Sequence, residues 1–268
     1  MIFVADSPLV ADVVPAANFE ARKCGQKPDL LLLHYTGMRS AAAAIAWLAR
    51  ADSRVSCHYV IDTDGRITQQ VPEALRAWHA GVSFWAGETD INSHSIGIEI
   101  QNPGHEMGYH PFPVAQMHAI AALGNDIVTR HGISAHRVLA HSDVAPQRKI
   151  DPGEKFDWRF LAERGVGLYV PPSPPRDDDQ GLSDAAPVAS IRAAQALLAR
   201  FGYDVAFTGA LDVQTIAAVT AFQRRFRTAR IDGRIDLATL ATLERLLAAI
   251  QMHAHAQVVA NSSNSVRA

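Results

Sequence analysis

The sequence is poor in cysteine, carries no excess of charge of one sign and lacks long apolar runs. Cys24 and Cys57 are its two cysteines and do not form a C-x-x-C pair. Neither a disulfide framework nor a thiolate zinc site is therefore indicated, although one bridge between them stays open. The formal net charge of −2 gives no electrostatic footprint for nucleic acid or an anionic membrane. No run approaches the ~20 apolar residues of a spanning helix, so we expect neither a nucleic acid partner nor a membrane span.

The start of the chain also lacks the features of a secretory signal. The opening stretch MIFVADSPLVADVVPAANFEARKCG contains Asp6, has no basic n-region and has no long apolar segment. On this ground we expect a cytoplasmic protein. Hydrophobic residues make up 48% and charged residues 19% of the 268 residues, which is typical of a soluble globular chain. The length predicts one main domain and a smaller one.

A composition change near residue 170 divides the chain. In residues 170–187, prolines, acids and small residues replace periodic apolar patterning, which is typical of a linker. The segment separates a first unit, residues 1–169, from a second, residues 188–250, followed by a polar tail, residues 251–268, that we expect to be frayed. Ten of the twelve histidines precede the linker. Any histidine chemistry is therefore expected in the first unit.

The first unit alternates strand and helix patterns. The apolar run Leu30 to Leu33 predicts a buried strand with His34 at its exit, and Asp64-Gly65 predicts a hairpin turn to which both residues bring positive φ angles. Strands interleaved with helices predict an α/β fold, a mixed central β-sheet flanked by helices. The expected strands are 30–33, 58–62, 67–71, 95–100 and 138–140, and the expected helices begin at Ser40 and at Pro113, the second ending near Gly132.

The second unit contains an internal repeat. TGALDVQTIAAV begins at Thr208 and DGRIDLATLATL at Asp232. Each copy has a glycine turn, an acidic candidate N-cap (Asp212 or Asp236) and a helix. With an amphipathic segment from Ile191 to Phe201 before them, these copies predict a small three-helix bundle.

Three side chains of the first unit could together hold a metal ion. His34 and His141 follow the ends of separate predicted strands, and Pro152 biases Asp151 toward an extended backbone. Nitrogen and carboxylate donors with one open position for water form a hydrolytic zinc centre. The pattern alone leaves a second interpretation open, because a histidine at a strand end is often a hydrogen-bonded structural residue, and no compact H-E-x-x-H motif is present.

Five ordered stretches resemble the type-2 N-acetylmuramoyl-L-alanine amidases, the AmpD- and AmiD-like family related to phage lysozyme amidases and peptidoglycan recognition proteins. The resemblance covers roughly residues 28–165. It implies that His34, His141 and Asp151 bind one zinc ion per chain, and it implies a type-2 amidase fold. The stretches are LLLHYT, VSCHYVIDTDGRITQQVPE, RAWHAGVS, SIGIEIQNPG and HSDVAPQRKIDPG.

The same resemblance implies that Glu99 is the catalytic carboxylate and Lys149 its cationic partner. Amide hydrolysis needs a base that returns its proton to the leaving amine and a positive donor for the oxyanion. Glu99 alternates with two isoleucines in SIGIEI, so its side chain is expected on the wetter strand face. Without the resemblance, Glu99 would be interpreted as a solvent-facing strand residue and Lys149 as a surface charge beside Arg148.

Substrate contacts are also implied. His79, in RAWHAG, matches a cleft residue of the family, and Trp78, Tyr35 and Trp85 could line a cleft for sugar or peptide. The alternatives are a structural histidine beside Trp78 and ordinary core aromatics. His58 is expected in the core or behind the ligands. Asp143 is interpreted as a decoy for the metal, and Cys57 as a buried thiol.

The second unit resembles the three-helix peptidoglycan-binding module of cell-wall hydrolases, through RAAQALLARFGY, TGALDVQT, AVTAFQRRF and DGRIDLAT. It departs at Thr208-Gly209, where Asp-Gly is usual. The resemblances together imply an enzyme that hydrolyses the bond between N-acetylmuramic acid and L-alanine in peptidoglycan or muropeptides. A non-catalytic peptidoglycan recognition protein and a zinc hydrolase of an unrelated amide stay as alternatives. A wall-binding module makes the periplasm or cell envelope the alternative to the cytoplasm, and the oligomeric state is left open.

Overall fold

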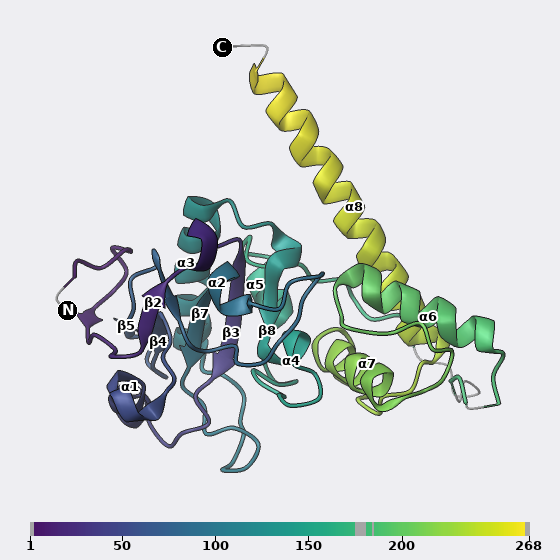
Figure 1. The fold of residues 1–268 in the computed structure, drawn as a ribbon, viewed down its shortest axis with the longest axis horizontal. Coiled ribbons are helices and arrows are strands. Elements are labelled where there is room, and N and C mark those ends of the chain that lie inside the picture. The colour runs from purple at the N-terminus through teal and green to yellow at the C-terminus, as the bar shows by residue number, and fades with distance from the viewer. Residues whose placement is uncertain (1–2, 175–180, 184, 266–268) are drawn as a thin grey trace. The chain divides into compact units, whose positions relative to one another are not determined.

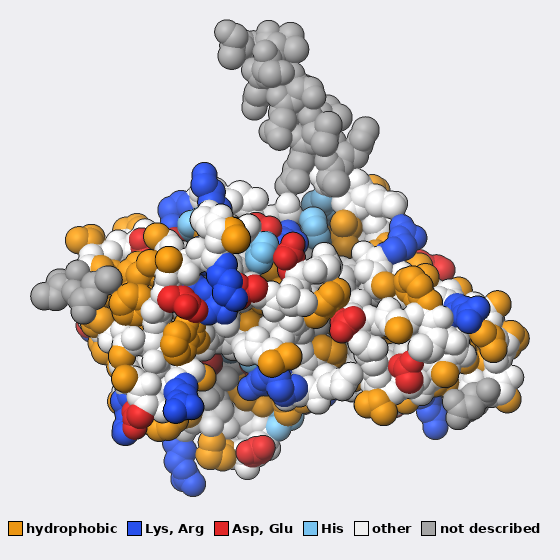
Figure 2. All heavy atoms as spheres, in the orientation of Figure 1, with side chains coloured by type: hydrophobic (Ala, Val, Ile, Leu, Met, Phe, Trp, Pro, Cys, Tyr) orange, Lys and Arg blue, Asp and Glu red, His pale blue; other side chains and the backbone are white. Residues whose placement is uncertain are grey.

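A computed structural model describes the backbone of residues 3–174, 181–183 and 185–265, with side chains up to residue 253. The chain divides into two compact units, Met1–Leu168 and Tyr169–Ala268. Figure 1 shows a sheet with helices around it in the first unit and helices alone in the second. On the face shown in Figure 2, basic and acidic side chains are interspersed, in keeping with the small net charge. No helix of the described residues is long and apolar enough to cross a membrane.

The first unit is built on a six-stranded sheet with the order β1-β5-β4-β7-β3-β8. The β4–β5 pair is antiparallel and the other pairs of this sheet are parallel, so the sheet is mixed, as predicted. A separate antiparallel ribbon joins β2 to β6. The strands are β1 (Asp12–Val13), β2 (Phe19–Ala21), β3 (Leu30–Tyr35), β4 (Tyr59–Ile61), β5 (Ile67–Gln69), β6 (Leu75–Ala77), β7 (Ser95–Ile100) and β8 (Val138–Ala140).

Helices flank the sheet, and the two that the sequence predicted begin at the expected residues. Ser40 Oγ accepts the backbone N–H of Ala43 at the start of α1, and Gly132, with φ of 67°, ends α3. Helix α1 packs against β4, and α3 packs against β3 and β4. The helices of this unit are α1 (Ala41–Ala49), α2 (Ile91–His94), α3 (Val114–His131), α4 (His141–Val144) and α5 (Trp158–Ala162), with short 3-10 helices η1 (Lys23–Gly25), η2 (Ala51–Ser53) and η3 (Ala135–Arg137).

The predicted hairpin is present, but its turn differs. Ile61 pairs with Ile67, so five residues connect β4 and β5. Gly65 has a positive φ, whereas Asp64 does not, because the Asp64 carboxylate instead accepts the backbone N–H of Arg66 at 2.8 Å. The prediction that both Asp64 and Gly65 have positive φ is therefore wrong for Asp64.

Strand β3 is longer than predicted and brings His34 into the sheet. It continues through His34 to Tyr35 instead of ending at Leu33. Leu30 to Leu33 are fully buried, as expected for a strand covered on both faces. His34 pairs in register with Glu99 of β7, and Glu99 pairs with Val60 of β4. Partners in register point to the same face of a sheet, so His34 and Glu99 lie side by side on one face.

The described residues of the second unit form three helices, α6 (Val188–Phe201), α7 (Val213–Phe226) and α8 (Leu237–Ser265). Asp212 and Asp236 accept the backbone N–H groups of Thr215 and Thr239, as predicted for N-caps. Helix α8 passes Gln251 and ends at Ser265, so it includes much of the polar tail expected from residue 251. No glycine or proline interrupts residues 237–265, which permits a continuous helix despite the polar composition.

Two glutamines explain the internal repeat. Gln195 Oε1 accepts the N–H of Gly209 at 2.9 Å, and its Nε2 donates to the Thr215 hydroxyl at 3.0 Å. Gln223 repeats this arrangement one helix later, where its Oε1 accepts the N–H of Gly233 at 2.8 Å. Each glycine turn is therefore held by the helix that precedes it. Residues 175–180 and 184 of the predicted linker lie outside the described residues.

Candidate active site

His34, His141 and Asp151 come together at the end of the sheet. His34 is the penultimate residue of β3, and His141 directly follows β8, which pairs with β3. Asp151 lies in the loop after α4, and its carbonyl accepts the N–H of Ser142 at 3.0 Å, which ties this loop back to α4. The three residues are only 1%, 3% and 5% exposed. The sheet and this short loop thus place three buried side chains at one point.

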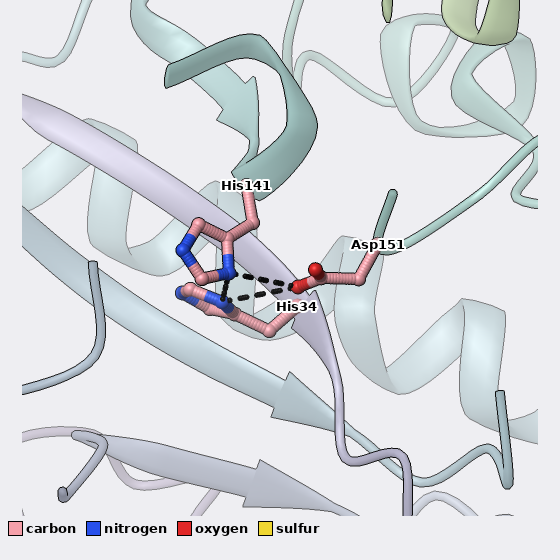
Figure 3. A group of neighbouring side chains, drawn as sticks. All are labelled: His34, His141 and Asp151. Atoms are coloured by element: carbon pink, nitrogen blue, oxygen red, sulfur yellow. Dashed lines mark hydrogen bonds and ion pairs between the residues drawn. The ribbon is translucent and has the colours of Figure 1, made fainter. Parts of the chain in front are cut away.

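The ligating atoms of this cluster converge closely (Figure 3). His34 Nδ1 lies 2.9 Å from His141 Nδ1 and 3.3 Å from Asp151 Oδ2, and His141 Nδ1 lies 3.0 Å from the same oxygen. Among the described residues, this is the one group of three or more histidine, cysteine or acidic residues able to share a metal ion. The three side chains that the sequence predicted as ligands are therefore assembled.

The chemistry of this donor set suits a cation. His141 Nε2 lies 3.1 Å from the carbonyl oxygen of Ala80, which can only accept, so Nε2 carries the ring hydrogen and Nδ1 is left with a lone pair. Burial, and next the neighbouring His141, lowers the pKa of His34 to about 4, so this ring is neutral at pH 7. Burial raises the pKa of Asp151, but the two histidines more than offset this and hold it below its ordinary value. Two imidazoles and one carboxylate with room for a fourth ligand are typical of a catalytic zinc site.

A backbone loop, residues 78–82, forms the layer behind the cluster. Asn92 Oδ1 accepts the N–H groups of His79 and Ala80 at 3.0 and 2.8 Å. The Arg148 guanidinium donates to the carbonyl oxygens of Ala80 and Val82, both at 2.8 Å. The loop that fixes the ring of His141 is therefore held from two sides. No sequence pattern indicated this role of Ala80, because a backbone carbonyl can belong to any residue type.

Glu99 lines the cleft beside the cluster but is not an ordinary solvent-facing residue. Burial, and next the charge of Asp151, raises the pKa of Glu99 well above its ordinary value, and Lys149 opposes this shift. Its Oε2 is buried and has no hydrogen-bond partner among the described residues. Strand alternation predicted the correct face for Glu99, which is half-buried and lines the cleft.

The cleft has a volume of about 450 Å³ and gathers the other residues singled out from the sequence. Trp85 is an exception, since it is 1% exposed and belongs to the core. Trp47 of α1, 43% exposed, also lines the cleft and was not singled out. Residues of the predicted site that line it are Tyr35, Trp78, His79, Glu99, His141, Lys149 and Asp151.

One wall of the cleft is an aromatic stack that the sequence did not reveal. His105 stacks on Tyr109 with ring centroids 4.1 Å apart and lies 3.2 Å from the Tyr35 hydroxyl. The Tyr109 hydroxyl donates to the carbonyl oxygen of Pro152 at 2.8 Å and accepts the N–H of Lys155 at 2.9 Å. The wall therefore holds the loop that carries Asp151. The contributing segment, residues 101–112, has no periodicity that could have predicted these contacts.

The remaining candidates have structural roles. His58 is buried, its Nδ1 accepts the N–H of Gly97 at 3.0 Å, and burial followed by the charge of Arg22 lowers its pKa to about 3. Asp143 accepts the N–H of Ala140 at 2.9 Å, so it caps the start of α4. Cys24 is exposed and Cys57 buried, and both are free thiols.

Comparisons with known proteins agree with this geometry. Residues 25–154 match the family described as "N-acetylmuramoyl-L-alanine amidase", and residues 188–243 match the family described as "Putative peptidoglycan binding domain". The chain is 38% identical over 242 residues to the N-acetylmuramoyl-L-alanine amidase AmiD of Escherichia coli, covering 85% of both chains. It is 36% identical over 167 residues to the 1,6-anhydro-N-acetylmuramyl-L-alanine amidase AmpD of Citrobacter freundii, covering 56% of this chain and 87% of that protein.

Two solved structures extend the likeness to most of the fold. The first is E. coli AmiD in complex with the substrate anhydro-N-acetylmuramic acid-L-Ala-D-gamma-Glu-L-Lys, which matches with a TM-score of 0.69 and 34% identity, over 85% of this chain and 92% of that one. The second is AmpDH3 of Pseudomonas aeruginosa in complex with anhydromuramic pentapeptide, with a TM-score of 0.66 and 29% identity, over 92% of this chain and 98% of that one. Sequence, fold and the buried cluster agree, and the chain belongs to the N-acetylmuramoyl-L-alanine amidase family.

Proposed function

We propose that this amidase is zinc-dependent and hydrolyses the amide bond between the lactyl group of N-acetylmuramic acid and the L-alanine of the stem peptide. The observation that carries the proposal is the convergence of His34 Nδ1, His141 Nδ1 and Asp151 Oδ2 within 3.3 Å of one another beside an open cleft. The muropeptides bound to AmiD and AmpDH3 support the choice of substrate. Peptidoglycan and soluble anhydro-muropeptides are the candidate substrates.

The three side chains would hold the zinc ion by two ring nitrogens and one carboxylate oxygen. When bound, zinc supplies Lewis acidity, which acidifies a water molecule and polarises the scissile carbonyl. The rest of the chemistry belongs to the chain itself. Its residues must orient the amide, accept and return one proton and stabilise one negative charge.

Glu99 is placed to move the proton. Its raised pKa brings the carboxylate closer to the working pH, where a group can both take a proton from water and give it to the leaving amine. The unpartnered Oε2 is the atom available for this exchange. Lys149 lies close enough to oppose the pKa shift of Glu99, and its ammonium group would donate to the developing oxyanion.

A non-catalytic recognition protein is the second candidate, and the observed side chains argue against it. A protein that binds muropeptides without cutting them needs neither the complete donor set nor a half-buried carboxylate with a raised pKa. Burying that carboxylate without a partner is costly, and such costs are typical of catalytic sites.

The experiment compares two substrates. Purified sacculi and soluble anhydro-muropeptides are incubated with the metal-loaded full chain, with and without a chelator, and products are identified by mass spectrometry. Chelator-sensitive release of intact stem peptides with a free L-alanine amine is expected, and Glu99→Gln should retain zinc but lose turnover. Absence of release from both substrates would refute the proposal. Turnover retained in Glu99→Gln would remove Glu99 from the mechanism.

The second unit is proposed to hold the enzyme at its polymer. Its match to a peptidoglycan-binding family supports this role. Removal of residues 188–268 should lower the rate on sacculi and leave the rate on soluble muropeptides unchanged. Equal losses on both substrates would contradict the proposed role.

A further inference from the structure

We infer that His79 is a positioning residue that fixes which nitrogen of His34 faces the metal, through a chain of hydrogen bonds that ends at the Ile91 carbonyl. The inference rests on the proposed function only in taking His34 as a ligand. It differs from a direct substrate contact, which was the expectation from the sequence. The chain of bonds runs from His34 through His79 and Ser95 to Ile91.

The direction of these hydrogen bonds is set by Ser95 and Ile91, at the end away from His34. The Ser95 hydroxyl lies 2.6 Å from the Ile91 carbonyl oxygen, which can only accept, so Ser95 gives its hydrogen to Ile91. Ser95 Oγ then acts as the acceptor for His79 Nε2, 3.3 Å away. Ser95 is 0% exposed, so bulk water does not compete for this oxygen. His79 therefore carries its hydrogen on Nε2.

The position of the hydrogen on His79 determines which ring nitrogen of His34 carries a hydrogen. With the hydrogen on Nε2, His79 Nδ1 has a lone pair and accepts from His34 Nε2 at 2.9 Å. His34 Nδ1 is then left without a hydrogen and faces Asp151 and His141. The opposite direction would put a hydrogen on His34 Nδ1, where it would block the metal. A partner that orients a metal-bound imidazole through its other nitrogen is a general feature of metal sites.

Close packing holds the His79 ring in place. A Cβ atom at Gly97 of β7 would lie 2.6 Å from His79 Nδ1, so the ring occupies space that only glycine leaves open. The backbone N–H of His79 is bound to Asn92 Oδ1 at 3.0 Å, and the ring of His58 lies edge-on with centroids 5.6 Å apart. His79 is therefore fixed by its backbone, by its ring nitrogens and by contact with β7.

Four variants distinguish a positioning role of His79 from an effect of side-chain volume or of burial. His79→Leu keeps the volume but removes the acceptor for His34 Nε2. His79→Asn offers its Oδ1 near the position of the ring Nδ1 and so restores that acceptor. Ser95→Ala removes the anchor of the chain. Ser93→Ala is the matched control, because Ser93 is equally buried at 2% exposure but donates to Asp90 at 2.8 Å, outside the chain.

The first readout is zinc affinity, measured on the full chain by competition with a chromophoric chelator. Loss of a hydrogen-bonding partner behind a metal ligand weakens binding by roughly 10- to 100-fold, and we expect a loss of this size for His79→Leu and a smaller one for Ser95→Ala. His79→Asn should recover most of the affinity, and Ser93→Ala should match the unaltered protein. Unchanged zinc affinity in His79→Leu would overturn the inference.

The second readout is the tautomer of His34 in the metal-free protein, obtained from the ¹⁵N chemical shifts of its ring. The hydrogen should be on Nε2 in the unaltered chain and be distributed over both nitrogens in His79→Leu. A hydrogen on Nδ1 of the unaltered chain would overturn the inference. Neither readout requires amide hydrolysis, so a chain that binds zinc as expected but cuts no muropeptide would refute the proposed function alone.

Discussion

Gly97→Ala is expected to weaken zinc binding although Gly97 is not one of the predicted ligands. The new Cβ would lie 2.6, 2.7 and 2.8 Å from three atoms of the His79 ring, whereas carbon and nitrogen atoms in contact are separated by roughly 3.5 Å or more. The ring must therefore retreat by about 1 Å. That movement exceeds the tolerance of the 2.9 Å bond to His34. We expect a loss of zinc affinity of roughly tenfold or more and a cost in stability of about 1 to 3 kcal/mol from overpacking.

Gly124→Ala is the matched control. Gly124 lies in α3, where a Cβ would come 2.9 Å from Val166 Cγ1, so it overpacks the same unit away from the site, and neither glycine has a positive φ. Thermal unfolding followed by circular dichroism measures the stability of both variants, and chelator competition measures zinc affinity. Both variants should be destabilised, and only Gly97→Ala should lose zinc affinity. Equal zinc affinity in the two variants would refute the claim that the position of the His79 ring matters to the metal.

Two further predictions concern the cleft wall and a buried carboxylate. Tyr109→Phe removes the hydroxyl that donates to the Pro152 carbonyl in the loop carrying Asp151. At about 1 kcal/mol for each lost hydrogen bond, this change should lower zinc affinity several-fold in the same competition assay. Unchanged zinc affinity would contradict the claim that Tyr109 holds this loop in place. Burial raises the pKa of Glu73, but hydrogen bonds from Arg130 and His131 more than offset this and hold it at about 2, below its ordinary 4.5. Because this pKa is lower in the folded than in the unfolded state, the ionised Glu73 stabilises the fold above pH 4.5. This contribution is lost as the pH falls toward 2. Chemical denaturation should therefore show that the free energy of unfolding falls by about 3 kcal/mol between pH 5 and pH 2. The loss over this pH range should be smaller in Glu73→Gln by about that amount, and an equal loss in that variant would contradict the assignment to Glu73.

Short-range patterns predicted the sheet and its helices because each signal was local. The apolar run at Leu30, the Ser40 cap and the Gly132 stop each act within one or two turns of the chain, and the structure has all three. The pattern alone left the metal cluster open, since a histidine at a strand end is often structural, and the family resemblance supplied the ligand set. The extension of β3 through Tyr35 could not be predicted from the apolar run, because the pairing of His34 with Glu99 supplies the extra ladder bonds.

The layer around the site could not be predicted from local patterns. The Ala80 carbonyl and the Tyr109 hydroxyl act on His141 and on the Asp151 loop from segments far away in the sequence, and no spacing rule connects them. The burial of Glu99 could not be predicted from local patterns either. Its alternation gave the correct strand face, but its burial depends on neighbouring elements that the strand pattern does not contain.

Zinc-dependent hydrolysis of the bond before L-alanine is tested most directly by the products of one reaction. Soluble anhydro-muropeptide is incubated with the chain stripped of metal, with the chain reloaded with zinc, and with zinc-loaded Glu99→Gln, and the products are resolved by mass spectrometry. A free stem peptide beginning with L-alanine is expected in the zinc-reloaded sample alone. Equal release of that peptide by the stripped chain, or its absence after reloading with zinc, would refute zinc-dependent hydrolysis of this bond.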